Sequence, residues 1–384
     1  MEYVTGLERF LAKYYTKVKG KRVGLVTNHT GLTRDLKSNV DLFYQHPDIN
    51  LVALYGPEHG VRGNARAGAK VEGGVDQITG LPVYSLYGST KKPTPEMLAD
   101  IDVLIFDIQD LGVRFYTYIS TLFYCMESCA ENDLSLIVLD RYNPLGRKVE
   151  GNIVKEEYRS FIGLYPIPQR HGMTVGELGQ WARGEMDIDL DLEVIPLEGW
   201  QGEYFDQMEI PWIPPSPNIP QFETALAYPV TCLIEGTNLS EGRGTANPFE
   251  YIGAPWIDPY KLINRLEAKK LAGVKFRPTF FVPTFSKHQE KECGGIHLII
   301  DERHKIDSFL TGLTILQEIL RLYPEETEFL DPFKEGMKHF FDLHMGTDGV
   351  RKALLAGAES SQIVEKWNEE RERFRSDREK YLLY

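Results

Sequence analysis

The stretch VLIFDIQDLGVRFY, residues 103–116, decides the fold. It begins as an unbroken run of apolar and β-branched residues and turns abruptly polar at Asp107 and Gln109. Unbroken apolar runs are typical of strands that are buried on both faces, as in a parallel sheet. Four further runs have the same form, and they occupy residues 21–31, 51–60, 134–144 and 230–245. The sequence therefore predicts one parallel sheet that contains all five.

Helical segments separate the strands of the first half of the chain. In HGMTVGELGQWARGEM, residues 171–186, Thr174 and Glu177 stand in the register of a capping box. The segment WIPPSPNIPQ, residues 212–221, is too rich in proline for a helix or a central strand and predicts an ordered loop. Further helices are expected at 38–46, 94–101 and 115–132. This alternation favours an α/β fold with a doubly wound, mostly parallel sheet.

The pattern changes after residue 245. Residues 274–285 and 293–302 indicate antiparallel strands, whereas 309–324 and 360–384 indicate amphipathic helices. At 384 residues the chain is too long for one ordinary core. We therefore expect an N-terminal domain over 1–245 and a smaller C-terminal α+β domain over 246–384.

Composition excludes several classes of partner. The net charge is −13, which disfavours nucleic acid because phosphate binding depends on basic patches. No stretch approaches the roughly 20 apolar residues that cross a bilayer, and the first residues lack the pattern of a secretory signal. We expect a cytoplasmic protein, or an exported one whose signal has been removed. The oligomeric state is left open.

Common cofactor and metal motifs are missing from the sequence. The four cysteines show no metal-ligand spacing, and there is no HExxH or CxxC pattern. The first strand is followed by TNHTGLT rather than by GxGxxG, which disfavours a dinucleotide, and no GxSxG elbow is present. We expect neither a cofactor nor a metal.

Polar residues at the strand ends are the candidates for function. In open α/β sheets ligands bind beyond the carboxyl ends of the strands. If the five runs share one sheet, the residues that follow them gather at one rim: Asn28, Glu58, His59, Asp107, Gln109, Asp140, Asn238, Glu241 and Arg243.

The motif GPEHG, residues 56–60, holds Glu58 and His59 between turn-forming residues. A carboxyl group fixed there can act as a proton donor if its surroundings raise its pKa. Alternatively, Glu58 only caps a turn or pairs with Arg62 or Arg66. Adjacent Glu and His at a strand end favour the chemical role.

The motif LSEGRGT, residues 239–245, adds Glu241 and Arg243 between glycines. It is either an anion cradle or a structural turn closed by an Arg–Glu pair. In the 106–118 region, Gln109 and Tyr116 are groups that bind the hydroxyls and the apolar face of a sugar ring.

At these motifs the chain resembles the NamZ-type exo-β-N-acetylmuramidases. The matching blocks are GLVTNHTG, LYGPEHGVRG, FDIQDLGVRFYTY, LDRYNPLG, YPIPQRHGMTVGEL, PPSPNIP, EGTNLSEGRGT with PFEYIGAP, and HMGTDGVR. The resemblance implies a Rossmann-like domain, a smaller C-terminal domain and an active site between them. It implies release of N-acetylmuramic acid from the non-reducing ends of peptidoglycan fragments, with Glu58 as the prime catalytic residue.

Residue roles follow from combining the motifs with this resemblance. Glycoside hydrolysis normally uses two carboxyl groups, so we expect Glu58 as acid, aided by His59, with Glu241 or Asp107 as its partner. The substrate's 2-acetamido group is the alternative nucleophile. The lactyl carboxylate of muramic acid calls for an arginine. The expected substrate contacts are Asn28, Arg62, Gln109, Arg114, Tyr116, Asp140, His171, Asn218, Asn238 and Arg243.

Two other functions stay open on the sequence alone. One is a metal- or anion-dependent hydrolase or transferase that acts on a small anionic metabolite held by GRGT. The other is a non-catalytic muropeptide-binding protein, in which the carboxylates only accept hydrogen bonds from sugar hydroxyls.

Overall fold

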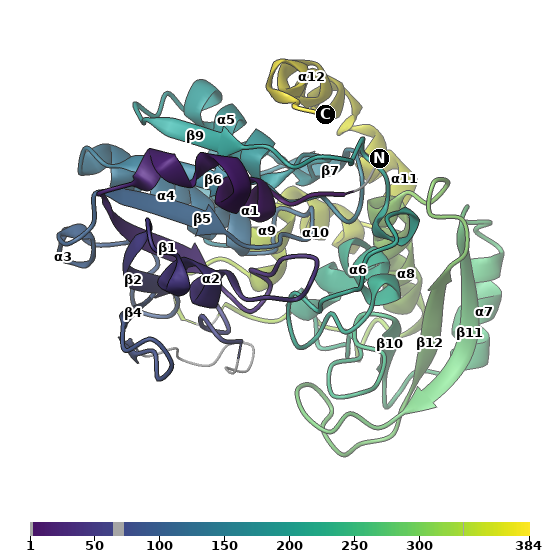
Figure 1. The fold of residues 1–384 in the computed structure, drawn as a ribbon. Coiled ribbons are helices and arrows are strands. Elements are labelled where there is room, and N and C mark those ends of the chain that lie inside the picture. The colour runs from purple at the N-terminus through teal and green to yellow at the C-terminus, as the bar shows by residue number, and fades with distance from the viewer. Residues whose placement is uncertain (1–2, 64–72, 333) are drawn as a thin grey trace.

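The computed structural model describes residues 3–63, 73–332 and 334–384. A seven-stranded sheet with the strand order β3-β4-β2-β1-β5-β6-β9 forms the first part of the molecule (Figure 1). All of its neighbouring strands are parallel except β3 and β4. The strands are β1 (Arg22–Thr27), β2 (Asn50–Gly56), β3 (Gly74–Val75), β4 (Pro82–Ser85), β5 (Val103–Asp107), β6 (Ser135–Leu139) and β9 (Leu192–Ile195).

Helices cover both faces of this sheet, which confirms the doubly wound fold. Alternate residues of β5 point into different hydrophobic clusters: Leu104 and Phe106 into one, Val103 and Ile105 into the other. The first cluster is closed by α4 (Tyr118–Glu131) and α5 (Val175–Glu185), and the second by α1 (Gly6–Arg9) and α2 (Asn39–Gln45). The expected capping box of Thr174 and Glu177 begins α5. A fifth helix, α3 (Pro95–Leu98), is shorter than the predicted 94–101.

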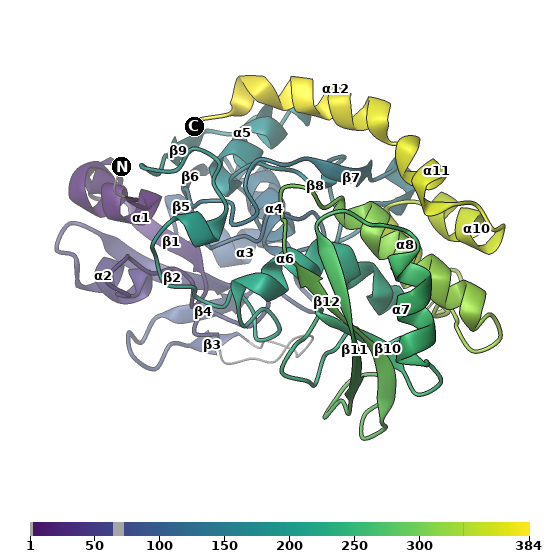
Figure 2. The same ribbon diagram turned by 90° about the vertical axis from the view of Figure 1, so that its right-hand side faces the viewer.

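The C-terminal part is built on an antiparallel sheet of strand order β10-β12-β11 (Figure 2). The sequence predicted β11 and β12 as antiparallel strands. The strands are β10 (Tyr251–Ala254), β11 (Val274–Phe281) and β12 (Cys293–Ile300). The helices are α6 (Phe222–Thr231), α7 (Pro259–Glu267), α8 (Ser308–Leu322), α9 (Phe340–Met345), α10 (Gly349–Leu355), α11 (Ser360–Glu365) and α12 (Asn368–Arg378). The expected domain boundary at residue 245 stays a prediction.

Short elements connect the two parts. A small antiparallel pair is made by β7 (Glu150–Ile153) and β8 (Pro168–Arg170). The chain returns through α12 to the first part (Figure 2). There the Tyr384 hydroxyl donates to Asp140 Oδ2 at 2.7 Å. The remaining short helical turns are η1 (Phe10–Tyr14), η2 (Tyr15–Val18), η3 (Glu156–Tyr158), η4 (Phe205–Gln207), η5 (Cys232–Gly236) and η6 (Glu379–Tyr381). No helix within the described ranges is long and apolar enough to cross a membrane.

One predicted strand is wrong. Residues 230–236 do not join the sheet but form the end of α6 and the turn η5. The run is apolar because Val230, Leu233 and Ile234 are buried inside a helical segment. A short apolar run buried on every side has no period that distinguishes a strand from a helix. Asn238, Glu241 and Arg243 therefore reach their places from a loop of the C-terminal part, not from the sheet.

Candidate active site

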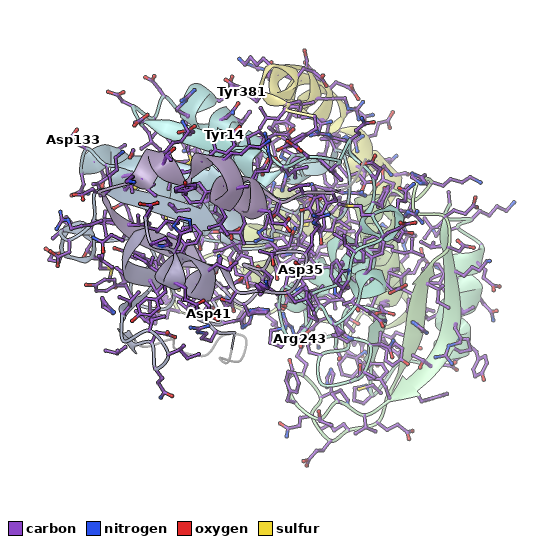
Figure 3. The ribbon with its side chains drawn as sticks, in the orientation of Figure 1. Tyr14, Asp35, Asp41, Asp133, Arg243 and Tyr381 are labelled. Atoms are coloured by element: carbon purple, nitrogen blue, oxygen red, sulfur yellow. The ribbon has the colours of Figure 1, made fainter. Side chains whose placement is uncertain are left out.

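A cavity lies beyond the carboxyl ends of β2 and β5. Its walls come from the loops after these two strands, from the proline-rich segment, from α6 and from the loop after η5. The lining residues are Glu58, His59, Phe115, Tyr116, Thr117, Tyr118, Ser216, Asn218, Ile219, Tyr228 and Arg243. Figure 3 shows Arg243 at the junction between the large sheet and the C-terminal part. The cavity thus joins both halves of the chain.

A constrained turn presents Glu58 to this cavity. Strand β2 ends at Gly56, and the backbone N–H of Gly60 donates to the carbonyl of Pro57 at 2.9 Å. His59 and Gly60 both have a φ of 74°. For histidine this left-handed conformation costs on the order of 1–3 kcal/mol, and such strain gathers at functional sites. The turn holds Glu58 where the Thr117 hydroxyl donates to its Oε2 at 3.4 Å.

Arg243 supplies a fixed positive charge in the same cavity. Glu235 Oε1 accepts from its Nε and Nη2 at 3.1 and 2.7 Å, and Glu241 Oε1 lies 3.2 Å from its Nε. The guanidinium also stacks over Phe249, with 4.9 Å to the ring centroid. Burial alone would lower the pKa of Arg243, but the two carboxylates outweigh it and raise the pKa. Among the described residues, none bonds Nη1, which leaves this nitrogen for a ligand.

Glu235 and Glu241 both pair with that arginine. Burial opposes the ionisation of Glu235, but the charge of Arg243 outweighs it and keeps the pKa of this carboxyl below its usual value. Glu241 is only 2% exposed, and its Oε2 lies 2.9 Å from Lys287 Nζ. Both glutamates therefore orient Arg243 instead of facing the cavity themselves.

Aromatic rings form the apolar wall of the cavity. Tyr116 meets Tyr118 and Tyr228 edge to face, with ring centroids 5.0 and 5.9 Å apart. The Tyr118 hydroxyl donates to the carbonyl of Pro215 at 2.9 Å, which fixes the proline-rich segment to the wall. His29 Nε2 holds the neighbouring carbonyl of Pro214 at 2.8 Å. Apolar faces with hydroxyls at their edges suit the ring of a sugar.

The structure brings together some of the predicted site residues, among them the general-acid candidate. Those that line the cavity are Glu58, His59, Tyr116, Asn218 and Arg243. Asn28 lies next to Tyr118, and its Oδ1 accepts from the backbone and the hydroxyl of Thr30 at 2.9 and 2.5 Å. It supports the wall and does not line the cavity.

Two predicted carboxylates lie in buried networks instead. Asp107 is fully buried, and its oxygens accept from Arg141 Nε at 2.6 Å and Asn39 Nδ2 at 2.7 Å. Asp140, also fully buried, accepts hydrogen bonds from four donors: the Arg141 and Gly176 amides and the hydroxyls of Thr174 and Tyr384. The guanidinium of Arg141 pairs with Asp107 and not with the adjacent Asp140.

Two predicted arginines also lie outside the cavity. Arg62 pairs with Asp76 at 3.0 Å and with Asp41 at 3.2 Å, so it is not the partner of Glu58; Arg66 lies outside the described residues. Arg114 is buried, and burial lowers its pKa to about 9. Its guanidinium donates to three backbone carbonyls, those of Asn152, Ile167 and His344.

The other predicted residues have structural contacts. Asn238 ties its loop to the carbonyl of Glu326 and the amide of Glu328. His171 is buried, with its Nε2 3.7 Å from Asp110 Oδ2. Gln109 donates to the carbonyls of Asp110 and Tyr142 and lines a different cavity.

Sequence reasoning missed several lining residues. Tyr228 lies on α6, in the segment that leads into the wrongly assigned strand, and Ser216 lies in the proline-rich loop. Tyr87, from the loop after β4, lies near Glu58 although it does not line the cavity. Burial and, as the second cause, the charge of the Glu58 carboxylate raise the pKa of its phenol. The clustering of prolines around Ser216 was the one signal that pointed to an ordered wall.

Comparison with known proteins identifies the family. The N-terminal model of exo-β-N-acetylmuramidase NamZ matches residues 23–223, and the C-terminal model matches residues 226–384. The peptidoglycan β-N-acetylmuramidase NamZ of Bacillus subtilis (strain 168) is 48% identical over 382 residues, which cover 99% of this chain and 91% of that protein.

Two solved structures share the fold, and both are DUF1343 family proteins from Bacteroides fragilis NCTC 9343. One has a TM-score of 0.92 at 40% identity, and the other has 0.79 at 34%. Each comparison covers 100% of this chain and 99% of the other. The resemblance drawn from the motifs is confirmed: the chain belongs to the NamZ family of exo-β-N-acetylmuramidases.

Proposed function

We propose that this protein is an exo-acting glycoside hydrolase that releases N-acetylmuramic acid from the non-reducing ends of peptidoglycan fragments, with Glu58 as the general acid/base. The observation that carries the proposal is that Glu58 and Arg243 line the same cavity, which has an aromatic wall. Family membership at 48% identity over nearly the whole chain supports the same activity.

The cavity matches the chemistry of N-acetylmuramic acid. This sugar carries a lactyl carboxylate, and Arg243 is the arginine among the described residues that line the cavity. Tyr116 and Tyr228 offer an apolar surface to the sugar ring, and Asn218 and Ser216 offer hydrogen bonds to its hydroxyl and amide groups. A protein with a negative net charge can thus bind an anionic sugar, because Arg243 places a positive charge in the cavity itself.

The second catalytic group is proposed to belong to the substrate. Of the described lining residues, Glu58 is the only one with a carboxyl group. Asp107 is engaged by Arg141 and Asn39, and Glu241 by Arg243 and Lys287. With these carboxylates held elsewhere, we assign the 2-acetamido oxygen as the nucleophile, while Glu58 protonates the leaving oxygen and later activates water.

Incubation with a muramic-acid-terminated disaccharide tests the function. Hydrolysis should release free N-acetylmuramic acid, detected by mass spectrometry. A muropeptide-binding protein would leave the disaccharide intact, which would overturn the proposal. An EDTA titration separates the metal-dependent alternative, because a metal hydrolase would lose activity and the proposed mechanism would not.

A further inference from the structure

A second cavity opens on the other side of the proline-rich segment. Its wall includes Ile210, Pro211 and Ile213, whereas Ser216, Asn218 and Ile219 line the candidate active site. The segment is therefore a partition with one cavity on each side. The anchors of Pro214 to His29 and Pro215 to Tyr118 lie between the two sets of residues. The second cavity is thus a separate space, not an extension of the first.

This second cavity lies at the point where the strand order of the large sheet reverses. Strand β1 has β2 on one side and β5 on the other, and Thr30 and Gln109 follow β1 and β5 into the cavity. In doubly wound sheets this crevice beyond the carboxyl ends is the usual place for a ligand. The position favours a binding site, and the polar lining adds a specific requirement.

Two buried polar groups of the lining are incompletely satisfied: Gln109 Oε1 has no hydrogen-bond donor among the described residues, and the proton of the Tyr3 hydroxyl has no acceptor there. Both side chains are 7% exposed. The orientation of the Gln109 amide is fixed, because its Nε2 donates at 2.8 Å to two carbonyls, those of Asp110 and Tyr142. Its oxygen therefore requires a donor. Buried polar groups are rarely left unpaired, so these atoms indicate a ligand.

The charged lining defines what that ligand carries. Arg34 and Arg141 line the cavity, and no described lining residue is acidic. Arg141 is 4% exposed; Asp107 engages its Nε and the Leu32 carbonyl its Nη2, and no described residue bonds Nη1. This nitrogen and the Tyr3 hydroxyl are donors for a carboxylate. Leu32, Leu36 and the isoleucines of the partition supply an apolar side.

We propose that the second cavity binds a small monocarboxylate that carries a hydroxyl or amide N–H beside an apolar group. Arg141 and Tyr3 bind the carboxylate, and Gln109 Oε1 accepts from the hydroxyl or N–H. A sugar acid and an N-acylated amino acid share this chemistry. The proposal is independent of Glu58 and of the reaction in the first cavity.

Isothermal titration calorimetry tests the proposal with N-acetylmuramic acid and N-acetylalanine, and neutral N-acetylglucosamine as the control. At least one acid should bind the second cavity, and which one binds identifies the source of the chemistry. Ile213→Trp fills the cavity and should remove this binding. Tyr3→Phe should weaken it about tenfold, as expected for one hydrogen bond to a charged group.

The matched control lies on the opposite side of the partition. Asn218→Ala should leave binding to the second cavity unchanged. If neither acid binds, or if binding survives Ile213→Trp and is lost in Asn218→Ala, the proposal is overturned. Turnover of a chromogenic muramide by Ile213→Trp and Tyr3→Phe should stay at the wild-type level, so a failure here is distinguishable from a failure of the glycosidase assignment.

Discussion

The hydroxyl of Thr117 donates to Oε2 of Glu58 at 3.4 Å, which joins the turn after β2 to the start of α4. These residues are 59 positions apart in the sequence, and the adjacent loops of two parallel strands bring them together. The contact orients the carboxyl group that we assign as the general acid. Substitutions at Glu58 and at Thr117 therefore test the assignment, with a larger effect expected at Glu58.

Replacement of Glu58 by Gln should lower kcat by a factor of about 100 to 10,000, the range typical of a lost general acid. Glutamine keeps the size of the side chain but cannot give up a proton. The measurement is turnover of aryl N-acetylmuramides with a series of leaving groups. The loss should be smallest for the most acidic phenol, which needs least protonation. A variant with wild-type rates would remove Glu58 from the catalytic role.

Thr117→Val should have a smaller effect, because it removes one neutral donor and leaves the acid in place. We expect kcat to fall about two- to tenfold with little change in KM, since one hydrogen bond contributes about 0.5–1.5 kcal/mol. Thr117→Ser restores the hydroxyl and should restore the rate. If valine and serine variants are equally impaired, the residue acts through packing and not through its contact with Glu58.

Arg243→Lys should raise KM for a muramide about tenfold, because lysine keeps the charge but loses the planar fork that binds a carboxylate. The same enzyme should process the corresponding N-acetylglucosaminide, which lacks the lactyl group, no worse than wild type does. Paired steady-state kinetics on the two substrates provide the test. An equal loss on both would mean that Arg243 only holds Glu235 and Glu241 in place.

The stereochemistry of the first product reports on the second catalytic group. If the acetamido oxygen is the nucleophile, two inversions give net retention, and the β-anomer of N-acetylmuramic acid appears first. Proton NMR of the anomeric signals during the first minutes of reaction distinguishes it from the α-anomer. Initial α-anomer would require a direct attack by water and a second carboxylate as its base.

Regular patterns in the sequence predicted the strand and the turn that position the site. Strand β5 alternates between the two hydrophobic clusters, and its unbroken apolar run identified it as a central strand. The turn at Glu58 was predictable because Pro57 fixes its own φ, and Gly56 and Gly60 permit the backbone conformations that a tight turn needs. Local chemistry determined these features, so the sequence sufficed.

Long-range pairing could not be predicted in the same way. Asp107, at a strand end, had the appearance of a rim carboxylate, but Arg141 neutralises it from the end of the next strand. Tyr228 reaches the cavity from α6, whose apolar end was interpreted as a strand. In both cases the partner is chosen by packing between elements far apart in the chain, for which a single sequence carries no periodic signal.

His344 offers a test of how burial behind the cavity wall affects stability. Its ring lies 4.0 Å from that of Phe115, and neither ring nitrogen has a hydrogen-bond partner among the described residues. Burial outweighs the opposing charge of Glu235 and, with a smaller contribution from the charge of Arg114, lowers its pKa from 6.5 to about 3. The folded protein therefore keeps this histidine neutral, while the unfolded chain takes up a proton below about pH 6.5.

Stability should therefore fall as the pH drops from about 6.5 towards 3, by about 1.4 kcal/mol per pH unit from this residue. His344→Phe keeps an aromatic ring against Phe115 and removes the titrating group. Urea unfolding at pH 7 should differ by less than about 1.5 kcal/mol between the two proteins, and at pH 4.5 the variant should be the more stable. If the free energies of unfolding of the two proteins fall equally between pH 7 and pH 4.5, His344 is protonated in the folded protein.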